Sequence, residues 1–368
     1  MRTFFFLLCV SVSACGGEVV HDLGSSNPPA TSNPPGSSTP PASSTAGANG
    51  TSACGPVVAP TAEPKTLDRH FWGYHGVASD GVDVYYTGKV DGQVLRVRGS
   101  GGKPEQVSSL DYMRNVKGHG GRVCWMSESV IECVDAGGKP WRVHSSGGRG
   151  DSWATFRDFD FDGAHVYWLN QHSVWRAPID GNGPATLVID GEDDTRTIAV
   201  TGDRVVWTTE TFATVRSCEK AACASPIDLV SFGRPAAAIF GGLAADAQHV
   251  YVPVHIPGKD GRRGGQLLRI PAAGGAAQTL TSCLDESPVN VAVDATTAVL
   301  VTHGNLEGTT QFGSPRQGGS VIAIPLDGTT PRLLAERQSY PAHVAITPTA
   351  IFWMNELDRQ GELQTLAR

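Results

Sequence analysis

The chain has 368 residues, a formal net charge of −7 and only 18% charged residues, and it contains 44 glycines. A modestly negative chain presents no basic face, which excludes nucleic acid as the expected partner. Abundant glycine with sparse charge is typical of an all-β protein with many turns.

Residues 1–14 have the pattern of a secretory signal peptide. An early Arg2 precedes the apolar run Phe4–Leu8, which is too short to span a bilayer. The next residues, Val12–Cys15, resemble the bacterial lipobox. The resemblance implies cleavage before Cys15 and attachment of a lipid to its thiol, whereas ordinary cleavage with an incidental cysteine is the alternative. We therefore expect a lipoprotein of the bacterial cell envelope, on the periplasmic or surface face of the outer membrane.

Residues 15–56 are rich in Pro, Ser, Thr and Gly and contain almost no large apolar residue. Such a segment cannot bury enough surface to offset the entropy lost on ordering, so we predict a disordered tether. Fully extended, at about 3 Å per residue, it would reach on the order of 100 Å. No second linker of this kind divides residues 57–368, which we expect to form one domain.

Residues 57–368 contain seven copies of a unit of short strands, spaced by roughly 40 to 50 residues, which is the period of propeller blades. The clearest copy is Phe161–Asp190. Its apolar and aromatic run does not alternate with polar residues, which indicates a strand covered on both faces. The corresponding runs of the seven copies are Val84–Tyr86, Val123–Trp125, Val166–Trp168, Val205–Trp207, Val250–Val252, Ala298–Leu300 and Ile351–Trp353.

The two ends of this region predict how the ring closes. The seventh copy ends with its third strand, Glu362–Leu366, and lacks a fourth. The segment Glu63–Leu67 resembles Lys103–Val107, the fourth strand of the first copy. Pairing of the two end segments would leave no unsatisfied sheet edge there. We therefore predict an all-β, seven-bladed β-propeller with four-stranded antiparallel blades, closed by its N-terminal strand.

One copy also carries a family resemblance. Tyr167–Asn170 followed by Arg176–Gly181 resembles the YWTD repeat of receptor propellers and of the related TolB-like family. The other copies share the hydrophobic pattern and the turns, and YWTD domains usually have six blades where seven are counted here. The resemblance implies a propeller architecture and a habit of binding, but a fold alone does not give a function.

Six cysteines remain after Cys9 leaves with the signal peptide and Cys15 takes the lipid. In an oxidising compartment, with no CxxC motif, we favour disulfides over a metal site. The predicted pairs are Cys124 with Cys133, Cys218 with Cys223 and, by elimination only, Cys54 with Cys283.

Two short motifs have less support. Asp158–Gly163 matches the first half of an EF-hand calcium loop, but its twelfth position is Leu169 instead of a bidentate Glu. The repeat alignment places this segment in an inner strand with Phe159 and Phe161 as core, so we expect no cofactor, with calcium as the alternative. Arg149–Asp151 spells the integrin tripeptide, which we interpret as a coincidence.

The repeat alignment shows a column of basic residues before the first strand of four consecutive copies, and a polar column one residue further in. Because guanidinium groups suit carboxylate or phosphate ligands, the columns predict a cationic binding arc at one mouth of the channel. Structural contacts between blades are the alternative. The two columns consist of His75, Arg114, Arg157 and Arg196, and of Asn115, Asp158, Asn290 and His343.

Two insertions, His255–Gly265 and His303–Gly319, separate the second and third strands of their copies. In a four-stranded blade this connection lies on the face where the inner strand enters, so both should overhang the mouth with the basic column. Loops gathered on one face suggest a binding face. Tolerated surface insertions are the alternative.

No Gly-x-Ser-x-Gly, HExxH or phosphate-loop motif stands in a convincing context. We therefore expect a monomeric, lipid-anchored, non-enzymatic binding or scaffold module for a protein, peptide or glycan. The alternative is an enzyme of the propeller lyase or lactonase kind with a metal at the channel mouth, for which His75, His119 and His343 are the first residues to examine. A purely structural envelope component, without a small ligand, is a third hypothesis.

Overall fold

A computed structural model describes residues 60, 62–70, 74–88, 92–146, 156–210, 213–233, 238–239, 241–257, 263–284, 286–303, 317–357 and 360–368. The predicted signal peptide (residues 1–14), the predicted tether with Cys15, Cys54 and the tripeptide Arg149–Asp151 lie outside the described residues, as do the side chains of His75 and Cys283. In the described part of the chain, no helix is long and apolar enough to cross a membrane.

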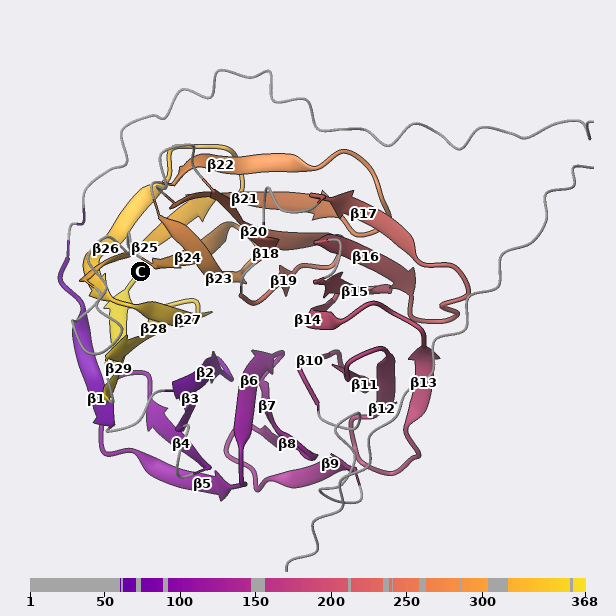
Figure 1. The fold of residues 1–368 in the computed structure, drawn as a ribbon. Coiled ribbons are helices and arrows are strands. Elements are labelled where there is room, and N and C mark those ends of the chain that lie inside the picture. The colour runs from indigo at the N-terminus through magenta and orange to yellow at the C-terminus, as the bar shows by residue number, and fades with distance from the viewer. Residues whose placement is uncertain are drawn as a thin grey trace, which may run out of the picture. The chain divides into compact units, whose positions relative to one another are not determined.

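The strands form seven antiparallel sheets that follow one another in chain order around a central channel (Figure 1). The first four sheets, from the inner strand outward, are β2 (Tyr74–Ser79), β3 (Asp83–Gly88), β4 (Gln93–Arg98) and β5 (Glu105–Ser109); β6 (Met113–His119), β7 (Arg122–Ser127), β8 (Val130–Asp135) and β9 (Trp141–Ser145); β10 (Phe159–Phe161), β11 (His165–Leu169), β12 (Val174–Pro178) and β13 (Thr186–Ile189); and β14 (Thr195–Val200), β15 (Arg204–Thr209), β16 (Thr214–Glu219) and β17 (Ile227–Ser231).

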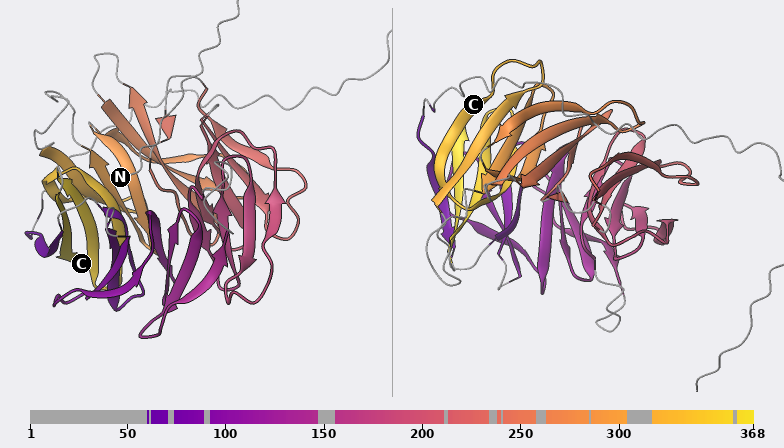
Figure 2. Two further views of the ribbon diagram at one scale, coloured as in Figure 1. Left: turned by 60° about the horizontal axis from the view of Figure 1, so that its bottom comes forward. Right: turned by 45° about the horizontal axis from the view of Figure 1, so that its top comes forward.

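The remaining three sheets complete the ring, and the two tilted views show that the blades are twisted (Figure 2). They are β18 (Ala238–Ile239) with β19 (Ala244–Ala245), β20 (His249–Pro257), β21 (Arg263–Pro271) and β22 (Gln278–Leu284); β23 (Ser287–Val293), β24 (Thr297–His303), β25 (Gln317–Pro325) and β26 (Arg332–Ser339); and β27 (Pro341–Ile346), β28 (Ala350–Leu357), β29 (Gln360–Ala367) and β1 (Lys65–His70). The chain is a seven-bladed β-propeller, as its repeats predict.

The ring closes through the first strand of the chain, as predicted. β1 pairs antiparallel with β29, with Lys65 opposite Thr365 and Thr66 opposite Gln364. The side chains of Thr66 and Gln364 also form a hydrogen bond of 3.0 Å. The strand starts two residues later than predicted, directly after Pro64, which has no N–H to donate to the ladder.

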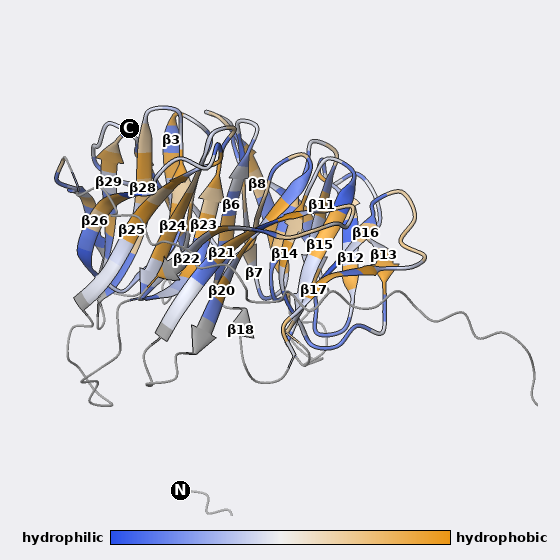
Figure 3. Ribbon diagram, turned by 90° about the horizontal axis from the view of Figure 1, so that it is seen from above, coloured by the Kyte–Doolittle hydropathy of each residue, from blue (hydrophilic) through white to orange (hydrophobic). Residues whose placement is uncertain are grey.

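The core lies between the blades. The described residues form seven clusters of buried apolar side chains, and each cluster joins two neighbouring blades. All six residues of β15 are buried, which explains why the second strands do not alternate apolar with polar residues. Hydrophobic residues accordingly concentrate in the strands (Figure 3). Each blade is therefore stabilised by its neighbours, as expected for stacked repeats.

The turn after the inner strand is capped by an aspartate in several blades. Asp80 accepts hydrogen bonds from the backbone N–H groups of Val82 and Asp83, and its second oxygen accepts one from the Tyr85 hydroxyl. Equivalent caps are made by Asp162, Asp246 and Asp294. Short polar side chains of this kind fix tight turns by satisfying local N–H groups.

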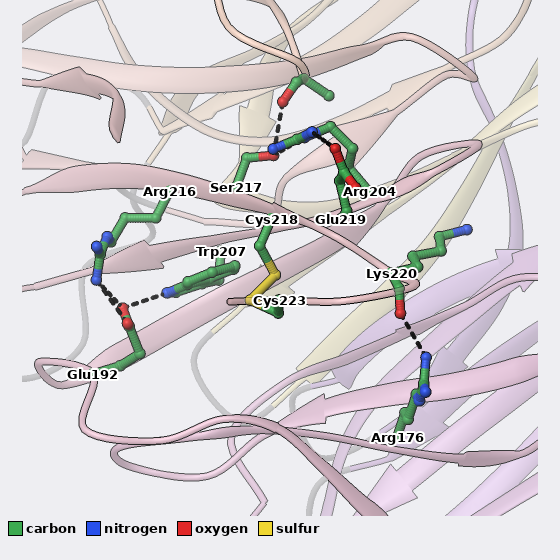
Figure 4. Close-up of a disulfide and its surroundings, with 11 residues drawn as sticks. Arg176, Glu192, Arg204, Trp207, Arg216, Ser217, Cys218, Glu219, Lys220 and Cys223 are labelled. Carbon is green, nitrogen blue, oxygen red and sulfur yellow. Dashed lines mark hydrogen bonds and ion pairs between the residues drawn. A yellow bond between two sulfur atoms is a disulfide. The ribbon is translucent and has the colours of Figure 1, made fainter. Parts of the chain in front are cut away.

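Both local disulfides are confirmed. Cys124 and Cys133 lie directly opposite each other on β7 and β8, and Cys218 is bonded to Cys223 just after β16 (Figure 4). Near the second bond, Glu192 accepts a hydrogen bond from the Trp207 indole and forms an ion pair with Arg216. The pairing of the remaining two cysteines lies outside the described residues.

The first predicted insertion is a hairpin extension over its described length. β20 and β21 stay paired from Val254 opposite Gln266 to Pro257 opposite Arg263. The sequence predicts a loop between the second and third strands over His255–Gly265, whereas both ends of this segment are paired strand residues. Residues 258–262, and residues 304–316 of the second insertion, lie outside the described part.

The inner strand of the fifth blade breaks into β18 and β19 where it approaches the sixth blade. Gly241 lies in the break with a φ of +85°, and Gly242 forms a parallel bridge with Asn290 of β23. A Cβ added to Gly241 would lie 1.0 Å from the carbonyl oxygen of Val289. Only glycine allows this approach between the two blades.

We expect Gly241→Ala to lower the melting temperature more than Gly121→Ala does. Both positions have positive φ, which costs about 1–2 kcal/mol for a side chain, but nothing lies within 4 Å of a Cβ at Gly121. The difference between the two variants therefore reports the clash with Val289. Thermal unfolding measures it, and equal melting temperatures would contradict the close approach.

Candidate functional site

The predicted basic column lies at the entry to the inner strands. Arg114 and Arg196 belong to β6 and β14, and Arg157 lies two residues before β10. Arg114 contacts Glu128 across 2.6 Å, and Arg196 forms an ion pair with Glu210. Both carboxylates belong to connections between second and third strands, which places these connections on the same face as the column.

A single carboxylate joins two of the arginines. Asp194 Oδ1 lies 2.8 Å from Nη1 of Arg157, and its Oδ2 lies 3.2 Å from Nη2 of Arg196. The mouth therefore carries an arc of alternating charge, formed by Arg114, Arg157, Arg196, Glu128, Asp194 and Glu210. The sequence predicts only a cationic arc, although Glu128 and Glu210 each follow their arginine by 14 residues, a spacing that could have indicated these acidic partners.

A cavity of about 620 Å³ occupies the channel and is lined by the inner strands of all seven blades. Its walls extend from Asn115, Asn290 and His343 to the turns that follow the inner strands, such as those at Gly163 and Gly202. None of the three arginines lines it. The predicted site residues therefore fall into two groups, with the arc at one mouth and the cavity toward the other.

Lys117 links three blades along the channel wall. Its ammonium group donates to the backbone carbonyl of Ile198 at 2.9 Å and lies 3.4 Å from Asp158 Oδ2. The other oxygen of Asp158 accepts a hydrogen bond from the Asn115 side chain at 2.8 Å. The second, third and fourth blades are thus joined through side chains at the channel.

Two aspartates satisfy the channel-facing edge of β14. Asp158 accepts a hydrogen bond from the backbone N–H of Ile198 at 3.0 Å, and Asp160 accepts one from Val200 at 2.8 Å. An inner strand has no further strand beside it at the channel. The N–H groups on its channel-facing edge therefore need other hydrogen-bond acceptors. These carboxylates supply them from the neighbouring blade.

The pKa values of two nearby carboxyl groups, Asp160 and Asp162, are shifted in opposite directions. Burial raises the pKa of Asp160, although Lys117 and the N–H of Val200 act in the opposite direction. Burial also acts to raise the pKa of Asp162, but hydrogen bonds from Lys220 and the N–H of His165 hold it below its usual value. Ionised Asp160 therefore costs stability, whereas ionised Asp162 contributes it.

The segment proposed as half a calcium loop is a strand and a turn. Phe159 and Phe161 are buried core residues of β10, and Asp162 caps the turn that follows. Among the described residues, no three His, Cys, Asp or Glu side chains are grouped as metal ligands would be. His119 and His343 both line the cavity, and the ring of His119 makes an edge contact with Phe161.

Lys117 and Asp160, a charged pair that was not predicted as a site, also stand out in the repeat alignment. Two residues beyond the polar column, five of the seven copies have alanine, and the exceptions are these two charged residues. The column consists of Ala78, Lys117, Asp160, Ala199, Ala244, Ala292 and Ala345.

A second missed contact joins the fifth and sixth blades. His255 of β20 and Ser287 of β23 are both buried, and a hydrogen bond of 3.0 Å connects Nδ1 of the imidazole to the hydroxyl. The two residues belong to different repeats at unrelated positions, so no spacing in the sequence indicates their contact.

No protein-family model and no curated protein matches the chain. Solved structures share its fold. The chain is similar to YCF48 bound to a D1 peptide, at 11% identity and a TM-score of 0.57 over 85% of this chain and 97% of that one. YCF48 from Cyanidioschyzon merolae is similar at 11% identity and a TM-score of 0.55, over 83% and 99%.

A third similar structure is PorZ, described as an essential bacterial surface component of the type-IX secretion system of Porphyromonas gingivalis. It matches at 10% identity and a TM-score of 0.51, over 83% of this chain and 39% of that one. At such identities, these likenesses show the β-propeller fold alone.

We expect Asp160→Asn to raise the melting temperature at pH 7, because the amide oxygen can still accept from Val200 and no charge is buried. A raised native pKa makes the aspartate destabilising above its unfolded value of about 3.9, so the gain should disappear as the pH falls below about 4. Thermal unfolding between about pH 3 and pH 8 measures both effects. Asp162→Asn is the matched control and should lower the melting temperature at pH 7. A lower melting temperature for Asp160→Asn would show that the ionised group stabilises the fold.

Proposed function

We propose that the protein is a lipid-anchored binding module of the bacterial envelope that holds a protein or peptide partner, without catalysing a reaction. The observation that carries the proposal is the arc of alternating charge on one mouth of a rigid ring. Lipid attachment at Cys15 and the tether of residues 15–56 would present this mouth at a distance from the membrane.

The arc is suited to recognition because its ion pairs contribute little to folding. Two of the arginine side chains remain 40% and 50% exposed. Exposed pairs of this kind are worth about 0–1 kcal/mol each, so exchanging a partner on the protein for one on a ligand costs little. Complementary charges across an interface contribute mainly specificity and association rate.

The setting of the arc also favours a macromolecular partner. Arginines and carboxylates from three consecutive blades offer donors and acceptors over a wide surface, which suits a peptide or protein better than a small anion. A propeller similar in fold is seen bound to a peptide, and another is described as a bacterial surface component. These likenesses support the proposal at the level of the fold.

The test is capture from an envelope extract by the full-length protein. The triple variant Arg114→Glu, Arg157→Glu, Arg196→Glu should lose the captured partner by at least tenfold. The control reverses three charges on outer strands, with Arg69→Glu, Arg142→Glu and Arg332→Glu, and should retain it. Melting curves establish that both variants are folded. Equal capture by the arc variant and the wild type would exclude the arc as the binding face.

An enzyme with a metal at the channel is the second candidate, favoured by the presence of both His119 and His343 in the cavity wall. It predicts bound metal in the purified protein and a thermal shift when metal is added. Loss of that shift in the double variant His119→Ala, His343→Ala would support it. Absence of any shift in the wild type would exclude it.

A further inference from the structure

At the level of the column that contains Lys117 and Asp160, the wall of the channel cavity has a charged part and an apolar part. β6 and β10 contribute Lys117 and Asp160, whereas β19, β23 and β27 contribute Ala244, Ala292 and Ala345. A volume of about 620 Å³ is within the usual range for small-ligand sites. Small apolar side chains facing a few charged groups indicate a ligand with a charged end and an aliphatic body.

The two lysines that line the cavity already have acceptors. Lys117 is held by Asp158 and the carbonyl of Ile198. Lys220 donates to Asp162 Oδ2 at 2.7 Å and to the carbonyl of Gly202 at 3.1 Å. Neither ammonium group is a strong candidate for binding an anionic ligand, because its charge is compensated within the protein.

The three carboxylates that line the cavity differ in the hydrogen-bond donors that already bind them. One oxygen of Asp162 accepts hydrogen bonds from backbone N–H groups of the turn, and the other accepts one from Lys220. One oxygen of Asp246 likewise accepts hydrogen bonds from backbone N–H groups of its turn, and the other accepts one from the Tyr251 hydroxyl. Asp160 accepts a hydrogen bond from the backbone N–H of Val200 on Oδ2, and the backbone N–H of Phe161 is a second donor to its carboxylate. Among the described residues, no lysine or arginine forms an ion pair with it, in contrast to Asp162.

Two carboxylates and one ammonium group meet at this point of the cavity wall, so one negative charge is in excess. Asp158 and Asp160 face the single cation Lys117, which binds Asp158. An unpaired carboxylate enclosed by protein is costly, and a cation that binds beside it removes that cost. Burial raises the pKa of Asp160, although Lys117 and the backbone N–H groups of Val200 and Phe161 act in the opposite direction.

We propose that the channel cavity binds a primary ammonium group on a short aliphatic chain, with Asp160 as its counter-ion and the alanine-lined wall as the surface for the chain. A free alkylamine and a lysine side chain share this chemistry. The site is distinct from the arc of alternating charge, and binding here does not require a protein partner at the other mouth.

Calorimetric titration of the full-length protein with n-butylamine at pH 7 tests the proposal. 1-Butanol and butyrate serve as neutral and anionic probes of similar length. The amine should bind and the other two should bind at least tenfold more weakly. Tighter binding of butyrate, or no binding of the amine, would overturn the proposal. Nα-acetyl-lysine amide distinguishes the two sources, because a side-chain ligand should bind at least as well as the free amine.

Three variants locate the binding event. Asp160→Asn should weaken amine binding at least tenfold, whereas Asp246→Asn, the same change at a fully engaged carboxylate, should leave it within twofold. Ala292→Leu fills the apolar side without changing charge and should also block binding. Undiminished affinity in Asp160→Asn would overturn the assignment of the counter-ion. Partner capture by the arc should be unaffected in all three, which separates this proposal from the proposed function.

Discussion

Ring closure is the constraint on which the rest of this structure depends. Each blade is a sheet with two apolar faces, and those faces are buried only against the neighbouring blades. The pairing of β1 with β29 brings together Thr66 and Gln364, which are 298 residues apart in the chain. It completes the interface where Phe352 of the seventh blade packs with Tyr86 of the first. Without it, two aromatic faces would meet water, at about 1.5–3 kcal/mol for each large side chain.

Much of the fold could be predicted because each propeller repeat contains the same pattern of short apolar strands separated by turns. Strands buried on both faces lack alternation, and the runs around Trp125, Trp168 and Trp207 mark consecutive blades. The Cys124–Cys133 bond was predictable because a short hairpin places its ends opposite each other. The length of the β20–β21 hairpin could not be predicted. Pairing beyond His255 requires both strands to continue together, and no local residue indicates that they do.

The candidate sites were less predictable, because each depends on contacts between repeats. The basic column was visible in the alignment, but Asp194 lies in a loop, and its position between Arg157 and Arg196 follows only from the fold. Asp160 stands out as a charged residue in a column of alanines. That Lys117 and Lys220 form their ion pairs with Asp158 and Asp162 instead follows only from the fold, and no spacing in the sequence reveals it.

Both candidate sites rely on the ring being closed, since the arc crosses three blades and the cavity is lined by seven. The most direct measurement is thermal unfolding of a full-length chain that lacks residues 60–70, compared with one that lacks residues 30–40 of the tether. Closure by β1 predicts that the first deletion abolishes the cooperative melting transition or lowers it by more than 10 °C, on the order expected for losing several kcal/mol, while the second melts like the parent. A chain without residues 60–70 that melts like the parent would contradict the account.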